Sequence, residues 1–337
     1  MLVITNMYPS PRNPGWGAFV DSQVTSLSKQ GAKVRTIARR SRNHWSYVSF
    51  YSRALFTLLF RDYELVHAHY GFHSALPAML LPGCKVVTTF HRGDALVEPR
   101  RGWIFRALQT WCVRRSVKLV AVSREIRDAL IADLGAEPAK ITVLPCGVNT
   151  RHFSPPSGTL ARALSSERPV VIWSGSPSSS DRKGLPVVLG VAARLPDVSF
   201  VFIGIDPLEH PANCDSRGRV ENSDIPPMLN RGDLFLFPTQ SEGTPVAVLE
   251  AMASGLLVLA SPVGGIVDLV TDGETGFLLQ SRDPVAVAEQ VQSILGLPDS
   301  EKRRIAANAR ELVSTHYSLE CVAQRLMSVY DSACGNG

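Results

Sequence analysis

The chain has 337 residues, of which 45% are hydrophobic and 19% are charged, and it contains 25 Gly and 23 Pro. This length exceeds what one hydrophobic core usually supports, so two domains are expected. The composition excludes a disordered chain, a collagen and a coiled coil. Net charge is divided unevenly: residues 1–155 contain 21 Lys and Arg against 9 Asp and Glu (net +12), and the remainder contains 14 against 21 (net −7).

Two halves of opposite sign indicate two domains with different partners. The basic half suits nucleic acid, an anionic lipid surface or a phosphorylated ligand, although a drift in charge between two similar halves would give the same pattern. The longest apolar candidate for a membrane span, residues 48–60, is short and contains Arg53. The cysteines lack CxxC spacing and the first residues read as a strand rather than a signal peptide, which predicts reduced thiols and a cytoplasmic protein.

Short, continuous apolar runs alternate with helical stretches along the first half, as is typical of parallel strands covered on both faces. These runs lie at residues 1–5, 33–38, 65–68, 85–89, 118–122 and 141–144. The pattern returns at residues 170–173, 198–203, 234–238, 256–260 and 277–279, and the stretches 284–295 and 299–331 are expected to be helical.

The predicted fold class is therefore α/β, with two Rossmann-like, doubly wound parallel-sheet domains facing a deep cleft. We expect the first, basic domain at residues 1–153, a Pro- and Ser-rich linker at 154–158 and the second domain at 159–315. The remaining residues, 316–337, would form a C-terminal helix, for which crossing back to the first domain is one option.

The segment 242–255 lies between two predicted strands and is the most informative in the chain. Pro245 suits the first turn of a helix, so that the free N–H groups at the helix start would seat a phosphate. Glu242 precedes this seat and Glu250 lies on the helix, so the two carboxylates would bracket a sugar nucleotide through its hydroxyl groups. Alternatively, Glu242 is a turn residue and Glu250 a solvated helix position.

Glu242 and Glu250, followed by Ala251-Met252-Ala253 and Gly255, resemble the signature of the retaining GT-B glycosyltransferases of family 4. Further segments in the matching order extend the resemblance over almost the whole chain. They are the loop with Gly15 and Gly17, the strand Val66-His67-Ala68-His69, the segment Phe90-His91-Arg92-Gly93-Asp94, the segment Pro145-Cys146-Gly147-Val148-Asn149, the run Arg182-Lys183-Gly184, and Gly264-Gly265. The N-terminal Met-Tyr-Pro-Ser-Pro is closest to members that make teichuronic acid and capsules.

The resemblance implies the GT-B fold and an enzyme of class EC 2.4, a hexosyltransferase that moves a sugar from a UDP- or GDP-sugar to a glycan or lipid-linked acceptor. Retention of the anomeric configuration and a place in cell-surface polysaccharide biosynthesis are part of the same expectation. The implied catalytic residues are Glu242, His91 and Lys183. The implied donor-binding residues are Gly15, Gly17, Arg182, Lys183, Gly243, Thr244, Pro245, Val246 and Glu250.

In this assignment Glu242 contacts the transferred sugar and Glu250 the ribose, while Lys183 offsets charge on the leaving diphosphate. Solvation at the surface is the alternative for Arg182 and Lys183. The chain has no Asp-x-Asp pair, so metal-independent catalysis is expected and no cofactor is assigned. His67 and His69 are expected to be structural.

Three positions depart from the family pattern. Ser176 stands where an Arg is expected to hold the diphosphate, Asn149 replaces the common Asp, and Arg92 replaces the common Gly. Either Arg182 substitutes for the Arg missing at 176 or donor binding is weaker than usual.

Cations and aromatic residues are also combined at residues 39–56 and 100–115. The second segment predicts a basic amphipathic helix of the kind that lies at a membrane interface. Packing of this helix on its own domain explains the pattern equally well; otherwise the protein would be peripheral at the inner face of the membrane. The membrane or acceptor face would consist of Arg100, Arg101, Trp103, Arg106, Trp111, Arg114 and Arg115.

Alternative functions are a sugar-nucleotide epimerase or phosphorylase on the same fold, or a nucleic-acid-binding protein that uses the basic half. RNA- and DNA-binding motifs are absent from the sequence, so no nucleic acid partner is expected. A dinucleotide-dependent oxidoreductase is excluded, because Gly15-Trp16-Gly17 lacks the third glycine and the strand at 33–38 ends in Arg39-Arg40 rather than an acid. The sequence assigns neither an oligomeric state nor the donor's base.

Overall fold

The computed structural model describes residues 1–11, 15–41, 43, 45–61, 63–156, 168–205 and 209–335. It divides the chain into two compact units, one made of residues 1–147 and 319–337 and the other of residues 148–318. We refer to them as unit 1 and unit 2. The division falls at 147/148 and 318/319, not at the predicted 153 and 316, and the predicted linker runs into residues outside the described ranges.

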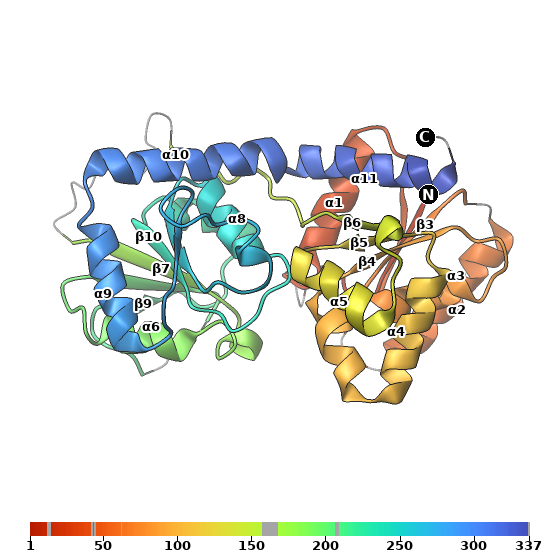
Figure 1. Cartoon of the computed structure of the whole chain (residues 1–337), viewed down its shortest axis with the longest axis horizontal. Coiled ribbons are helices and arrows are strands. Elements are labelled where there is room, and N and C mark those ends of the chain that lie inside the picture. The colour runs from red at the N-terminus through yellow and green to blue at the C-terminus, as the bar shows by residue number, and fades with distance from the viewer. Residues whose placement is uncertain are drawn as a thin grey trace. The chain divides into compact units, whose positions relative to one another are not determined.

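Unit 1 is built on a six-stranded parallel sheet with the order β2-β1-β3-β4-β5-β6 (Figure 1). Its strands are β1 (Leu2–Thr5), β2 (Arg35–Ala38), β3 (Val66–His69), β4 (Val86–Phe90), β5 (Lys118–Ala121) and β6 (Ile141–Val143). The inner strands are buried along their whole length, as continuous apolar runs require.

The main helices of unit 1 cover this sheet and connect its strands. They are α1 (Ala18–Lys29), α2 (Ser46–Phe60), α3 (Gly71–Met79), α4 (Trp103–Arg115), α5 (Arg124–Leu134) and α11 (Leu319–Cys334). Helix α5 shows how the local sequence sets these elements: the Ser123 hydroxyl caps the Ile126 N–H at its start, and Gly135, with φ 67°, ends it. Helix α11 lies beside α1 (Figure 1). The Ser26 hydroxyl of α1 donates to the Leu319 carbonyl at 3.0 Å.

Unit 2 repeats this architecture with the strand order β12-β11-β10-β7-β8-β9. Its strands are β7 (Val170–Ser174), β8 (Ser199–Ile203), β9 (Cys214–Ser216), β10 (Leu234–Phe237), β11 (Leu257–Ala260) and β12 (Phe277–Leu278), and its helices are α6 (Leu185–Ala192), α7 (Ile225–Leu229), α8 (Val246–Ala253), α9 (Pro284–Leu295) and α10 (Asp299–His316). The predicted α/β class with two parallel-sheet domains is confirmed.

The strand orders place a topological switch point in each sheet, between β1 and β3 in unit 1 and between β7 and β10 in unit 2. The connections that leave the two central strands run in opposite directions there. Open α/β sheets bind ligands in the crevice that this creates at the carboxyl ends of the strands. The loops after β7 and β10 are therefore the first place to look for a site in unit 2.

Three differences from the sequence analysis have local causes. Strand β9 was not predicted, because its three residues are not an apolar run. The stretch expected to be helical at 299–331 is interrupted between α10 and α11, where the Tyr317 carbonyl accepts a hydrogen bond from the Val148 N–H at 2.9 Å and Ser318 forms a bridge to Val148. Helix α11 begins at Leu319 and ends at Cys334, so it is shorter than the C-terminal helix predicted at 316–337.

Candidate active site

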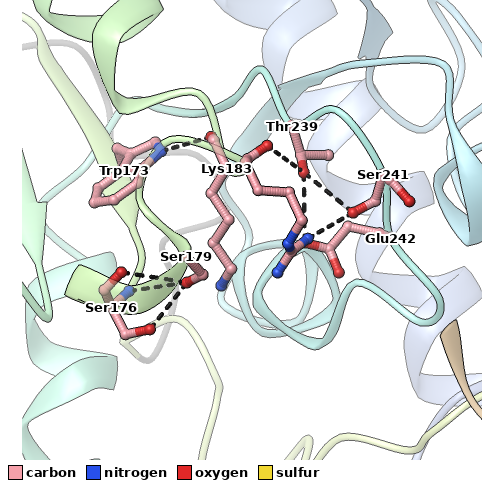
Figure 2. A network of polar contacts seen from close by, with 8 residues as sticks. Trp173, Ser176, Ser179, Lys183, Thr239, Ser241 and Glu242 are labelled. Carbon is pink, nitrogen blue, oxygen red and sulfur yellow. Dashed lines mark hydrogen bonds and ion pairs between the residues drawn. The ribbon is translucent and has the colours of Figure 1, made fainter. Parts of the chain in front are cut away.

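The loop that follows β7 carries Lys183 and is fixed by its backbone. The Lys183 carbonyl accepts a hydrogen bond from the Trp173 indole N–H at 3.0 Å, and its N–H donates to the Ser179 carbonyl at 2.9 Å (Figure 2). Gly184 has φ 79°, and a Cβ there would collide with the Pro238 carbonyl oxygen, so only glycine fits this crossing between the loops after β7 and β10. The loops after β7 and β10 are therefore in close contact at Gly184, the residue that follows Lys183.

Arg182 joins these loops through its side chain and its carbonyl. Its Nη1 lies 2.7 Å from the Glu242 Oε1 and also donates to the Ser241 carbonyl. Its carbonyl accepts from the Gln240 N–H at 2.8 Å and from the Thr239 hydroxyl at 3.2 Å. Both charged groups are partly buried, so the arrangement holds the Glu242 carboxylate in one place at the carboxyl edge of the sheet.

Helix α8 begins one residue later than its sequence predicts. Pro245 precedes the helix as its N-cap, with ψ 79°, instead of forming its first turn, because the chain makes a tight turn in which the Val246 N–H donates to the Thr244 carbonyl at 3.0 Å. The turn is held from the other side, where the Gly265 N–H donates to the Gly243 carbonyl at 3.0 Å. A Cβ at Gly265 would collide with that carbonyl, so the Gly264-Gly265 pair serves to support the start of α8.

Glu250, on α8, and Lys183 influence each other's ionisation. Burial raises the pKa of Glu250 to about 7, and the Lys183 charge opposes this shift. Burial likewise lowers the pKa of Lys183, while the carboxylates of Glu242 and Glu250 act against that change. The Lys183 Nζ lies 5.4 Å from the centre of the Phe237 ring. A partly buried ammonium group with a depressed pKa is suited to receive an anion, which would restore its charge.

Ser176 occupies the position of the expected Arg and makes only local hydrogen bonds. Its hydroxyl lies 2.9 Å from the Ser179 hydroxyl (Figure 2). It also lies 3.3 Å from the Ser178 hydroxyl, within the short turn Pro177–Ser179. Because Arg182 pairs with Glu242 in this structure, a role for Arg182 in holding phosphate stays a prediction.

His91 lies in unit 1 at the end of β4 and is buried. Its backbone N–H donates to the Asp94 Oδ1 at 2.7 Å, its ring Nε2 lies 3.4 Å from the His69 Nδ1, and its ring stacks on Tyr70 with 4.4 Å between centroids. Burial, and to a smaller extent His69, lower the pKa of His91 well below its usual value. The imidazole is therefore neutral at physiological pH and able to form a hydrogen bond in either direction.

The two histidines of β3 have different surroundings. His67 is bonded at both nitrogens, to the Thr89 hydroxyl and to the Tyr330 hydroxyl of α11, each at 2.7 Å, which is the structural role predicted for it. His69 instead contacts His91, and its Nε2 is buried without a partner. The sequence analysis missed this contact; the β3–β4 register that pairs His69 with Thr89, next to His91 along the chain, is what reveals it.

Gly15 and Gly17 differ as well. Gly17 has φ 75° and begins α1, and a Cβ there would lie 2.5 Å from the Met7 carbonyl oxygen. Gly15 is exposed, and a Cβ there would meet nothing within 4 Å. The structure thus explains Gly17 by its turn, whereas contact of either residue with a donor stays a prediction. Glu242, Lys183 and Glu250 belong to unit 2 and His91, Gly15 and Gly17 to unit 1, so the cleft expected between the domains also stays a prediction.

The basic aromatic helix is α4, with Arg100 and Arg101 in the turn before it (Glu98–Arg101). Trp103 is 79% exposed, whereas Trp111 packs on the core of unit 1. Arg106 donates to the Asp133 carbonyl and Arg115 to the Met79 carbonyl, while Arg114 is exposed. Part of the predicted face is therefore engaged by its own unit. The sequence analysis did not identify the outer face of α2, where the exposed large apolar side chains are Val48, Phe56, Leu59 and Phe60, with Trp45 just before it.

Among the described residues, no three His, Cys, Asp or Glu side chains are grouped as a metal site would need. No helix in the described parts of the chain is long and apolar enough to span a membrane. Neither observation decides whether the reaction needs a metal or whether the protein meets a membrane.

Comparison with known proteins agrees with this geometry. The glycogen synthase of Mycobacterium tuberculosis is 26% identical over 294 residues, covering 80% of this chain and 69% of that protein. The UDP-Gal:alpha-D-GlcNAc-diphosphoundecaprenol alpha-1,3-galactosyltransferase of Escherichia coli is 25% identical over 305 residues, covering 82% and 78%. Sucrose-phosphate synthase from Thermosynechococcus elongatus has the same fold, with a TM-score of 0.81 at 18% identity over 100% of this chain and 99% of that chain. Anabaena HepE in complex with UDP and glucose has a TM-score of 0.77 at 16% identity over 98% and 99%.

Family models cover most of the chain. Residues 3–152 match the model described as glycosyltransferase family 4, and residues 139–296 match the model described as glycosyl transferases group 1. This match favours a glycosyltransferase over the alternative functions of epimerase, phosphorylase and nucleic-acid-binding protein. The chain belongs to the group 1, family 4 glycosyltransferases with the GT-B fold, and it is a glycosyltransferase.

Proposed function

We propose that the chain transfers a sugar from a nucleoside diphosphate sugar, with UDP or GDP as the leaving group, to a glycan or lipid-linked acceptor with retention of configuration. Two relatives support this proposal: HepE is described in complex with UDP and glucose, and the E. coli relative uses UDP-Gal and a diphosphoundecaprenol-linked acceptor. Cell-surface polysaccharide biosynthesis is the pathway class that fits such an acceptor. The observation that carries the proposal is the partly buried Lys183, which lies in the loop after β7 at the switch point of unit 2 and feels the charges of Glu242 and Glu250.

The proposed roles follow from the positions of the side chains. The diphosphate lies at Lys183 and at the start of α8, where the ammonium group offsets the charge that grows on the leaving oxygen as its bond to the sugar breaks. Glu242, fixed by Arg182, accepts hydrogen bonds from the transferred sugar, and Glu250 accepts them from the ribose. His91, whose imidazole is neutral and whose backbone N–H is bonded to Asp94, contacts the sugar from the side of unit 1. We propose that no metal or other cofactor is required.

We also propose peripheral contact with an anionic membrane through unit 1. Support comes from the exposed apolar side chains of α2 and from Trp103 at the start of α4, with Arg53 and Arg114 exposed on the same two helices. No acidic residue lies on α2 or α4.

Replacement of Glu242 tests the enzymatic proposal. Glu242→Gln keeps the shape of the side chain but removes the charge that binds the sugar hydroxyls, so transfer of labelled sugar from UDP- or GDP-sugars to short glycans or extracted lipids should fall at least 100-fold. Binding of the nucleoside diphosphate should change less than threefold, and circular dichroism should show the native fold. Full transfer activity in this variant would contradict the proposed site.

A further inference from the structure

Arg39 directly follows β2 and is a buried cation that the donor site does not use. Only 7% of the residue is exposed. Its guanidinium carbon lies 4.0 Å from the centre of the Tyr47 ring and 5.5 Å from that of Trp16. Among the described residues, no carboxylate forms an ion pair with it. A buried charge is costly unless it is paired, so the structure leaves this cation without the counter-charge it needs.

Only some of the N–H donors of the Arg39 guanidinium form hydrogen bonds with described residues. Its Nε donates to the Ser46 hydroxyl at 2.7 Å and its Nη2 to the Asn43 carbonyl at 3.1 Å, both neutral acceptors. Across the described part of the chain, Nη1 has no acceptor. These two bonds orient the guanidinium and leave its Nη1 donors unused by the described residues.

Asn6 adds a second incomplete polar group next to Arg39. It follows β1, whose last residue Thr5 pairs with Ala38 of β2, and the Arg39 N–H donates to the Thr5 carbonyl at 3.0 Å. The Asn6 Nδ2 donates to the hydroxyl of Tyr47, the residue on which Arg39 stacks, at 3.3 Å. Within the described ranges, the Asn6 Oδ1 is buried without a hydrogen-bond partner. An orphaned acceptor and an unpaired cation thus adjoin the same tyrosine.

Asn6 and Arg39 lie where sheets of this kind bind ligands. Asn6 ends the central strand of unit 1, at the switch point between β1 and β3 where open α/β sheets bind ligands. At the end of the second strand of such sheets, an acid binds ribose hydroxyls and an Arg accommodates a phosphate. The basic Arg39-Arg40 pair, which excluded a dinucleotide cofactor, therefore fits a phosphate at the same edge.

We propose that Arg39 and Asn6 form a subsite for a phosphate group carried by the acceptor. Arg39 Nη1 donates to the phosphate oxygens, and Asn6 Oδ1 accepts from a neighbouring hydroxyl of the same ligand. Arg40, which is exposed and lies 5.5 Å from the Tyr8 ring centre, attracts the anion from the rim. Two acids of unit 1 lie in this neighbourhood: Asp21 accepts a hydrogen bond from the Tyr8 hydroxyl, and Glu98 pairs with His73. The proposal rests on the proposed function and specifies its acceptor as a phosphate or diphosphate ester, whether soluble or lipid-linked.

The test is calorimetric titration of the whole chain with two phosphate probes while the nucleotide site is saturated with UDP. The probes are inorganic pyrophosphate, and phosphatidylcholine vesicles with and without phosphatidic acid. Arg39→Gln should weaken the binding of at least one probe tenfold or more, Arg39→Lys should weaken it less, and Arg35→Gln, an exposed change on the same strand, should have no effect. Loss of pyrophosphate binding indicates a soluble acceptor phosphate, loss of vesicle binding a lipid-linked one, and loss of both a site that accepts either.

A second variant separates ligand binding from a structural role of Arg39 through its bonds to Asn43 and Ser46. Asn6→Asp supplies the missing counter-charge beside the guanidinium, and the Tyr47 hydroxyl can donate to the new carboxylate. It should abolish binding of the phosphate probe without lowering the unfolding midpoint. If the wild type binds neither probe, or if Arg39→Gln and Asn6→Asp bind them as the wild type does, the subsite is wrong. A failure of UDP binding in the same titrations would instead contradict the donor site in unit 2.

Discussion

Glu250 should make unit 2 less stable as the pH rises, and its replacement by Gln should remove this effect. The pKa of Glu250 is about 7 in the folded protein, against 4.5 for an unperturbed glutamate. The native state therefore holds the proton more tightly than the unfolded chain does, and the free energy of unfolding falls as the pH rises from below 4.5 to above 7.

The size of the effect follows from the two pKa values. Between pH 5 and pH 8, a carboxyl with these values contributes a loss of about 2.5 kcal/mol in the free energy of unfolding. The amide of Glu250→Gln is neutral throughout, so the excess stability of the variant over the wild type should grow by about 2.5 kcal/mol between pH 5 and pH 8. Buried groups of unit 1 that also titrate, such as His69 and Asp94, are common to both proteins and cancel in the difference.

Urea unfolding followed by circular dichroism at pH 5 and pH 8 measures this difference. The matched control is Glu289→Gln, on an exposed position of α9, which should follow the wild type at both pH values. Equal pH dependence of the wild type and Glu250→Gln would refute the argument that burial governs the ionisation of Glu250.

Two further changes test the geometry. Gly184→Ala should reduce the free energy of unfolding by about 2–4 kcal/mol, because the added methyl group would collide with the Pro238 carbonyl oxygen at a positive φ. The control Gly273→Ala has a similar φ but open space around it, so it should cost about 1 kcal/mol. Equal losses of stability in urea unfolding would contradict the close contact between the two loops at Gly184. Phe60→Ser combined with Trp103→Ser should weaken cosedimentation with anionic vesicles at least tenfold. Val285→Ser, which changes an exposed apolar residue of unit 2, should leave cosedimentation unchanged. Unchanged binding of the double variant would contradict the proposed membrane contact through α2 and α4.

Much of the fold was predictable because strands in a doubly wound sheet are short apolar runs. Each predicted strand is present with its bounds shifted by at most two residues. Strand β9, at the sheet edge, lacked that signal because Cys214–Ser216 contains two polar residues. The break between α10 and α11 was not predictable from periodicity, because it depends on the hydrogen bond between Val148 and Tyr317, which are distant in sequence.

The candidate site divides in the same way. The positions of Glu242, Glu250 and Lys183 on the carboxyl edge of unit 2 could be foreseen, since each lies in a segment next to the end of a predicted strand. The pairing of Arg182 with Glu242 could not, because it depends on how the loops after β7 and β10 cross at Gly184. The burial of Arg39 could not be predicted from the sequence either, because arginines are mostly exposed. It becomes visible only in the structure, where the guanidinium lies over the rings of Tyr47 and Trp16.

The central claim is that a nucleoside diphosphate binds beside Lys183 in unit 2. Thermal unfolding with UDP, GDP, ADP and NAD in separate samples, with and without Mg²⁺, tests it on the wild type and on Lys183→Met. A nucleotide at about 100 times its dissociation constant stabilises the native state by roughly 2.7 kcal/mol. The account predicts a raised midpoint with UDP or GDP that does not need Mg²⁺ and is lost in Lys183→Met. A midpoint that no nucleotide raises, or one that rises equally in Lys183→Met, would contradict it.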